Sequence, residues 1–205
     1  MRLKRGYILA SKRTDLSVGA HVVYGRPGTG KTYFLAERAL RSVRRGRPAV
    51  TDFRLPGCLQ FDDRLLHGEM IYDSDIYLDE AYKYFNSRNF RSFSSSMHDF
   101  FSLHRHNGNT IYLGTQHPAR LDVVIRELVD DFVLLSATSL PFVDHPVWFT
   151  RRFYFDDPCR VPTVAAEGLV KPFAVERSLF SWSVARAYDT HALRSTDVPL
   201  DLVPW

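Results

Sequence analysis

The stretch that decides the fold is Gly25-Arg26-Pro27-Gly28-Thr29-Gly30-Lys31-Thr32. An apolar run from Ala20 to Tyr24 precedes it, and a helical pattern from Tyr33 to Arg45 follows it. This order of strand, glycine-rich loop and helix is the context that a phosphate-binding loop (P-loop) requires. Glycines let backbone N–H groups turn toward phosphate oxygens, and the helix N-terminus adds partial positive charge. The stretch therefore predicts a nucleotide-binding site.

Within this loop, two side chains carry specific tasks. Lys31 can reach the β- and γ-phosphates, and the Thr32 hydroxyl can bind Mg²⁺. We expect all eight residues of the stretch to contact the nucleotide. The sequence has no Asn-Lys-x-Asp motif for reading guanine, which argues against a GTPase.

A second informative stretch is the apolar strand Ile76-Tyr77-Leu78, which ends in Asp79-Glu80. A carboxylate at the end of a strand beside a P-loop can hold Mg²⁺, so we assign Asp79 to the metal together with Thr32. Glu80 can then polarise the attacking water as a general base. A kinase does not need this residue, whereas a hydrolytic motor does.

A third strand, within Asn109 to Gln116, ends in the polar pair Thr115-Gln116. A polar side chain at that point can lie between the γ-phosphate and the attacking water, where it senses which nucleotide is bound. The alternative is an ordinary turn at the end of a strand. In the company of the other motifs we interpret Gln116 as the sensor.

The pattern of elements indicates an α/β fold. At least five apolar strands, with helices between most of them, predict a mostly parallel sheet covered on both faces. Ligands of such sheets bind at the carboxyl ends of strands, so Gly25, Asp79 and Gln116 can converge. We expect one P-loop domain over 1–205, comprising a basic arm (1–18), a core (19–137) and a C-terminal β/α extension (138–205).

Several local interpretations accompany this fold. Helices are expected over Ser92 to His106 and over Ser178 to Thr190. The cations of the helix after the P-loop, Arg38 among them, fit a solvated face. The pair Arg151-Arg152 fits an edge strand packed with aromatic residues better than a nucleic-acid contact, although a DNA contact there or near Arg91 stays open.

Composition limits the class of protein to which this chain can belong. The 205 residues are 45% hydrophobic and 24% charged, which is ordinary for a globular protein, and the net charge of +4 permits contact with nucleic acid. No apolar run of membrane-spanning length occurs, so no membrane span is expected. The two cysteines, Cys58 and Cys159, fit free thiols in a reducing compartment. The histidines at 98, 104, 106 and 117 do not favour a metal site over their ordinary roles.

At this point the order of motifs resembles a known family. Five segments carry the resemblance: the P-loop, Leu78-Asp79-Glu80-Ala81, Phe85-Asn86-Ser87-Arg88, His104-Arg105-His106-Asn107-Gly108 and Ile111-Tyr112-Leu113-Gly114-Thr115-Gln116. Over roughly residues 20 to 137 they are similar to the zonular-occludens-toxin-like assembly ATPases of filamentous phages, within the FtsK–HerA group of DNA-pumping motors. The filamentous-phage proteins carry a membrane span after the ATPase domain. None is seen here, so we expect closer kinship with the soluble ATPases that package genomes.

The resemblance implies a viral motor that hydrolyses ATP, with Mg²⁺, to package double-stranded DNA during virion assembly. It implies a homo-oligomeric ring in which a neighbour's arginine completes the site, with Arg126, Arg105 and Arg88 as the candidates and a structural ion pair as the alternative for each. Implied partners are the genome and a viral capsid or membrane vertex protein. The implied location is the host cytoplasm or the packaging vertex.

Three other functions are compatible with these motifs. The nearest is a filamentous-phage-type extrusion ATPase that works with a separate membrane partner. A small-molecule kinase would consume ATP only with an acceptor, and Glu80 would be dispensable. A nucleotide switch or assembly scaffold would turn over slowly and would not respond to DNA.

Overall fold

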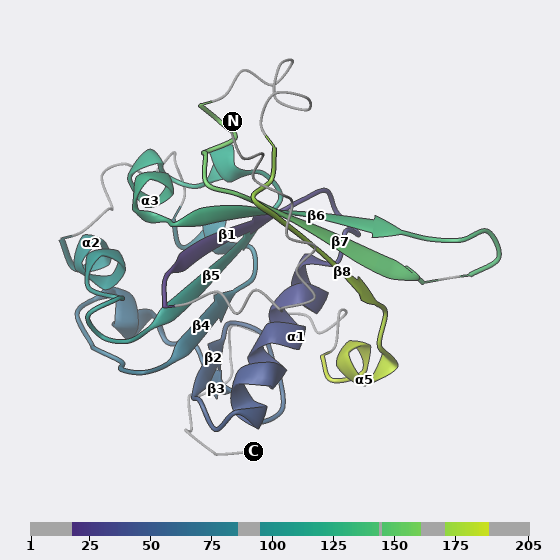
Figure 1. Cartoon of the computed structure of the whole chain (residues 1–205). Helices are drawn as coiled ribbons and strands as arrows, with labels where there is room; N and C mark the ends of the chain where they lie inside the picture. Colours follow the sequence, from purple (N-terminus) through teal and green to yellow (C-terminus); the bar gives the residue numbers. More distant parts are fainter. Residues whose placement is uncertain (1–17, 86–94, 144, 161–170, 189–205) are drawn as a thin grey trace, which may run out of the picture.

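The computed structural model describes residues 18–85, 95–143, 145–160 and 171–188 (Figure 1). Within them, eight strands form one sheet in the order β3-β2-β4-β5-β1-β6-β7-β8. The strands are β1 (Ala20–Tyr24), β2 (Ala49–Thr51), β3 (Leu59–Gln60), β4 (Asp75–Leu78), β5 (Thr110–Thr115), β6 (Asp131–Thr138), β7 (Trp148–Tyr154) and β8 (Ala174–Leu179). The α-helices are α1 (Lys31–Arg44), α2 (Ser95–Ser102), α3 (Val123–Leu128) and α5 (Trp182–Ala185), and short 3₁₀ helices are η1 (Asp63–Leu66), η2 (Ala81–Lys83) and η4 (Pro118–Arg120).

The sheet has a parallel part and an antiparallel part. Strands β3, β2, β4, β5, β1 and β6 run parallel to their neighbours. Strands β6, β7 and β8 are antiparallel, and β6 and β7 form a long hairpin that projects from the rest of the molecule (Figure 1). The predicted mostly parallel α/β sheet with a C-terminal β/α extension is confirmed.

Alternate residues of each strand face opposite layers, because successive side chains of a strand point to opposite sides. Tyr77 and Tyr112 pack in the core under α1 and α5, with ring centroids 5.0 Å apart. Their neighbours Ile76 and Ile111 pack on the other face, in the core under α2 and α3. Figure 1 shows the two helix layers on either side of the sheet.

The C-terminal part of the fold differs from our expectation. The helix predicted over Ser178 to Thr190 is wrong at its start, since Ala174–Leu179 is strand β8, and the helix α5 spans only Trp182–Ala185. The exposure of β8 alternates along its length, which is a strand pattern, and its pairing with β7 overrides any helical tendency. Helix α2 ends at Ser102 and not at the predicted His106, and residues 92–94 of the predicted helix lie outside the described residues.

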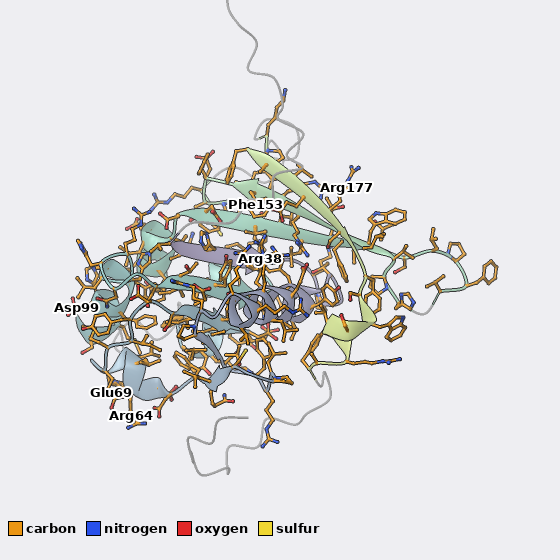
Figure 2. The ribbon with its side chains drawn as sticks, turned by 60° about the horizontal axis from the view of Figure 1, so that its bottom comes forward. Arg38, Arg64, Glu69, Asp99, Phe153 and Arg177 are labelled. Atoms are coloured by element: carbon orange, nitrogen blue, oxygen red, sulfur yellow. The ribbon has the colours of Figure 1, made fainter. Side chains whose placement is uncertain are left out.

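Two expectations about arginines are wrong: Arg38 was expected on a solvated face and Arg151 on an edge strand, but both are buried, and β7 is an inner strand between β6 and β8. Arg38 and Arg151 are 4% and 3% exposed, and both pair with Glu176, at 3.1 and 3.4 Å. Arg151 also pairs with Glu37. The solvated position predicted for Arg38 is therefore wrong, and a DNA contact through Arg151 is excluded by its burial. In Figure 2, the label of Arg38 lies near the middle of the view, whereas that of Arg177 lies toward its edge.

Candidate functional site

The P-loop lies between the end of β1 and the start of α1, at the carboxyl edge of the parallel strands. Gly28 and Gly30 have φ values of 80° and 84°, a conformation that other residues rarely adopt. Lys31 Nζ donates to the carbonyl oxygens of Gly25 (3.0 Å) and Arg26 (3.2 Å). Burial lowers the pKa of Lys31, while Glu80 and Asp79 act in the opposite direction. Lys31 is thus held inside the loop that is to bind phosphate.

Thr32 and Asp79 meet at the predicted metal position. Thr32 Oγ1 donates to Asp79 Oδ2 over 2.7 Å. The backbone N–H of Asp79 donates to Asp52 Oδ1 over 2.7 Å, which orients the strand end. A hydroxyl and a carboxylate oxygen side by side are hard ligands of the kind Mg²⁺ binds, so these residues fit the ion. Asp52, which follows β2, was not predicted as part of the site.

Glu80 and Gln116 also meet, as the strand-end argument predicted. Gln116 Nε2 donates to Glu80 Oε1 over 3.4 Å. Glu80 has left-handed backbone angles, with φ 54° and ψ 46°, which turn its side chain out of the line of β4. Its second carboxylate oxygen, Oε2, is buried without a hydrogen-bond partner among the described residues. A buried carboxylate oxygen of this kind can accept a proton from water.

The structure describes two of the three arginine candidates, and both form ion pairs within their own chain. Arg105 pairs with Asp130, whose backbone N–H donates to Ala20 at the start of β1, so Arg105 lies at the sheet edge opposite the P-loop. Arg126 pairs with Asp157 and its side chain is 14% exposed, against 61% for Arg105. Arg88 lies outside the described residues.

One arginine near the site was missed by the sequence reasoning. Arg120 ends the short helix η4, four residues after Gln116. Its guanidinium centre lies 5.3 Å from the centroid of the Tyr82 ring, and its charge is one of the influences that lower the pKa of Lys31. Nothing in its sequence position distinguishes it from a solvated arginine. Only the approach of the two loops after β4 and β5 brings it near the P-loop.

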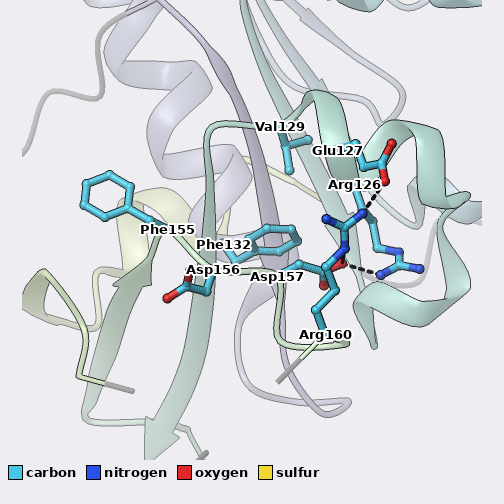
Figure 3. Close-up of a pocket in the computed structure, with 8 residues that line it drawn as sticks. All are labelled: Arg126, Glu127, Val129, Phe132, Phe155, Asp156, Asp157 and Arg160. Atoms are coloured by element: carbon cyan, nitrogen blue, oxygen red, sulfur yellow. Dashed lines mark hydrogen bonds and ion pairs between the residues drawn. The ribbon is translucent and has the colours of Figure 1, made fainter. Parts of the chain in front are cut away.

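A cavity in the described part of the chain contains none of the predicted phosphate-binding or metal residues. It has a volume of about 510 Å³ (Figure 3). Its charged groups neutralise one another, since Arg126 pairs with Asp157 and Arg160 with Glu127. The cavity is lined by Arg126, Glu127, Val129, Phe132, Phe155, Asp156, Asp157 and Arg160.

Two further findings concern membranes and thiols. Among the residues that the structure describes, no helix has the length and apolar character needed to cross a membrane. Cys58 and Cys159 are both free thiols, as predicted, and burial raises the pKa of Cys58 to about 11. Neither thiol touches the P-loop residues in the described contacts.

Fold and site together define a P-loop NTPase. Residues 62–139 match the family model described as zonular occludens toxin (Zot), which confirms the resemblance to the Zot-like ATPases. The matched segment contains Asp79, Glu80 and Gln116. No curated protein is similar enough to count as a match.

Solved structures extend this comparison. The N-terminal domain of zonular occludens toxin from Neisseria meningitidis is similar in fold, with a TM-score of 0.56 and 18% identity over 84% of this chain and 100% of that one. The genome packaging NTPase B204 from Sulfolobus turreted icosahedral virus 2, in complex with ATP-gammaS, gives a TM-score of 0.48 and 14% identity, covering 65% of this chain and 91% of that one. The first of these matches supports the fold of nearly the whole described chain.

Proposed function

We propose that this protein is a viral motor that hydrolyses ATP to move the DNA genome into the virion during assembly. The observation that carries the proposal is the contact between Gln116 and Glu80 beside the Thr32–Asp79 pair. A nucleotide-binding protein that only stores or transfers phosphate has no need of a water-activating carboxylate there. The Zot family match covers Asp79, Glu80 and Gln116, and the resemblance to phage assembly ATPases supports a role in virus assembly.

The residues divide the work of hydrolysis. The backbone of the P-loop and Lys31 hold the phosphates, and Thr32 and Asp79 would hold Mg²⁺, which neutralises charge on the phosphate oxygens when bound. Glu80 takes a proton from the attacking water through its buried oxygen. Gln116 holds Glu80 in position, and it can transmit the loss of the γ-phosphate to β5.

We further propose a ring of identical subunits in which Arg105 completes the site of a neighbour. Arg105 is 61% exposed and belongs to the sheet edge opposite the P-loop, so it can face another subunit. Arg126 is largely enclosed by its own chain and is the weaker candidate. An arginine supplied in this way contributes about 10³–10⁵ in rate in comparable enzymes.

The first experiment measures phosphate release from ATP with and without double-stranded DNA, over a range of protein concentrations. Specific activity should rise with concentration as rings assemble, and DNA should stimulate it. Full activity in a sample shown to be monomeric by sedimentation would contradict the ring. Activity unchanged by DNA would contradict the motor and favour a switch.

A mixing experiment tests the neighbour's arginine. Lys31→Ala subunits cannot bind phosphate productively but still supply Arg105, whereas Arg105→Ala subunits bind ATP but lack the arginine. Each variant alone should be nearly inactive, and a mixture should recover part of the activity. Arg64→Ala, which removes an equally exposed arginine, is the control and should keep full activity. No recovery on mixing would contradict the assignment.

The extrusion ATPase of filamentous-phage type is the second candidate, because the matching family model is the Zot model. The two functions differ in the DNA and in the partner. Stimulation by single-stranded DNA, together with co-purification of a phage membrane protein, would favour extrusion. Stimulation by double-stranded DNA and association with empty capsids would favour packaging.

A further inference from the structure

The order of the strands in the sheet determines on which side of the P-loop the metal and the base of a nucleotide would lie. Asp79 follows β4 and Gln116 follows β5, and both strands lie on one side of β1, from which the P-loop departs. The metal and the attacked phosphate therefore lie on the β4–β5 side. A nucleoside triphosphate extended along the loop must carry its base toward the other side, where β6, β7 and β8 lie (Figure 1).

A cluster of aromatic rings occupies that other side. Phe180 stacks on His145 with ring centroids 4.6 Å apart, and Trp182 meets both rings edge to face at 5.0 Å. Tyr33 of α1 stacks on Phe149 of β7 at 4.5 Å and lies 5.6 Å from Phe180. The five rings form a continuous series from the first turn of α1 to the first residue of α5.

This cluster starts at the P-loop itself. A methyl group placed on Gly30 would lie 2.5 Å from an atom of the Phe149 ring, so ring and loop are in direct contact. The Tyr33 hydroxyl accepts a 2.8 Å hydrogen bond from the Ser181 backbone N–H, which fixes the turn that carries Phe180 and Trp182. The outer rings are therefore connected to the P-loop through packed rings and a backbone hydrogen bond.

The outer end of the cluster is open to solvent. Trp182 is 54% exposed, although tryptophan is a large apolar side chain that gains from being covered. Arg186 adds a cation, with its guanidinium centre 5.6 Å from the centroid of the Trp182 ring. Aromatic rings of this kind bind nucleobases by stacking, and stacking tolerates any base because every base has a π face.

We propose that Trp182 and His145 form the platform on which the base of the bound nucleotide stacks. The proposal rests on the proposed nucleotide-binding function and adds the site of the base to it. The cluster supplies ring faces and no described contact that reads base edges, so purine triphosphates, ATP and GTP, should bind with similar affinity. Inorganic tripolyphosphate should bind the P-loop without using the platform.

The test compares Trp182→Ala with the unchanged protein for two ligands, ATP and tripolyphosphate, by calorimetry at fixed Mg²⁺. The variant should bind ATP about tenfold more weakly, within the range that stacking on one ring contributes, and should bind tripolyphosphate unchanged. Trp182→Phe should restore most of the affinity, and His145→Ala should act in the same direction as Trp182→Ala. Leu179→Ala removes another exposed apolar side chain nearby and should change neither affinity.

The other possible results would contradict either the platform or the proposed function. Equal weakening of both ligands would overturn the platform, because the effect would then be on the phosphate loop. Unchanged ATP affinity with an altered sedimentation coefficient would also overturn it and assign Trp182 to a protein interface. If the unchanged protein bound neither ligand, the proposed function itself would fail.

Discussion

Gln116 Nε2 donates a hydrogen bond to Glu80 Oε1 over 3.4 Å, and this contact joins the ends of two adjacent parallel strands. It lies next to the Thr32–Asp79 hydrogen bond. Because β4 and β5 are buried and paired along their lengths, a shift of one strand end is opposed by the sheet. We therefore expect Gln116 to pass a change at the phosphates to a stiff element.

The role of Glu80 gives the first prediction. Glu80→Gln should reduce ATP hydrolysis by about 10²-fold or more, because general bases contribute on the order of 10²–10⁴ in rate. The affinity for ATP should stay the same, since the amide keeps the shape of the side chain. Phosphate release and calorimetric binding measure the two effects. Glu69→Gln, at an exposed ion pair, is the control, and equal losses in both variants would disprove the role.

The pair Thr32–Asp79 predicts how the reaction depends on magnesium. Asp79→Asn weakens the negative charge at the metal position, so half-maximal hydrolysis should require a several-fold higher Mg²⁺ concentration. Nucleotide binding in the presence of a chelator should hardly change. Asp63→Asn, an exposed aspartate in η1, serves as the comparison. A magnesium titration that is the same for both variants would exclude Asp79 as a metal residue.

Gly30 combines two constraints that can be separated by mutation. Gly30→Ala places a methyl group against the Phe149 ring and also strains a backbone with φ 84°. Gly46→Ala strains a similar backbone, with φ 73°, but meets no atom within 4 Å. Denaturant unfolding should show a loss of about 1–2 kcal/mol for Gly46→Ala, the usual cost of this conformation, and a clearly larger loss for Gly30→Ala. Equal losses would mean that the ring moves aside freely.

The buried arginines predict a large effect at Glu176. Glu176→Ala removes the shared carboxylate and leaves Arg38 and Arg151 enclosed with less compensation. Breaking a buried ion pair costs about 3–5 kcal/mol in comparable proteins. Glu127→Ala breaks the exposed pair with Arg160 and should cost about 1 kcal/mol or less. Urea unfolding of both variants checks this, and a small loss at Glu176 would show that the network contributes little.

His104 predicts part of the pH dependence of stability. Burial lowers the pKa of His104, and the side chain is 4% exposed. His104 therefore makes its full contribution to the free energy of unfolding above its unfolded pKa, near 6.5. This contribution is lost as the pH falls below that value, because the unfolded chain takes up a proton that the folded chain resists. His104→Gln should flatten the change of the unfolding free energy between pH 7 and 5. An unchanged slope would contradict this.

The sequence by itself determined the nucleotide site. The glycines, Lys31 and Thr32 follow a strand and precede a helix, and each of these local constraints acts within a few residues. Asp79, Glu80 and Gln116 could be placed because parallel strands end at a common edge. The alternation of apolar strands and helices along the sequence likewise predicted a sheet covered by helices on both faces.

Only the tertiary structure decided the secondary structure and the contacts of the C-terminal third of the chain. Pairing with β7 makes Ala174–Leu179 a strand, and it brings Glu176 to Arg38 and Arg151, which are far apart in sequence. It also connects Trp182 and His145, through Phe180 and Phe149, to Gly30 of the P-loop. The physical reason is that burial and ion pairing depend on partners over a hundred residues away, whereas a motif depends on its immediate neighbours.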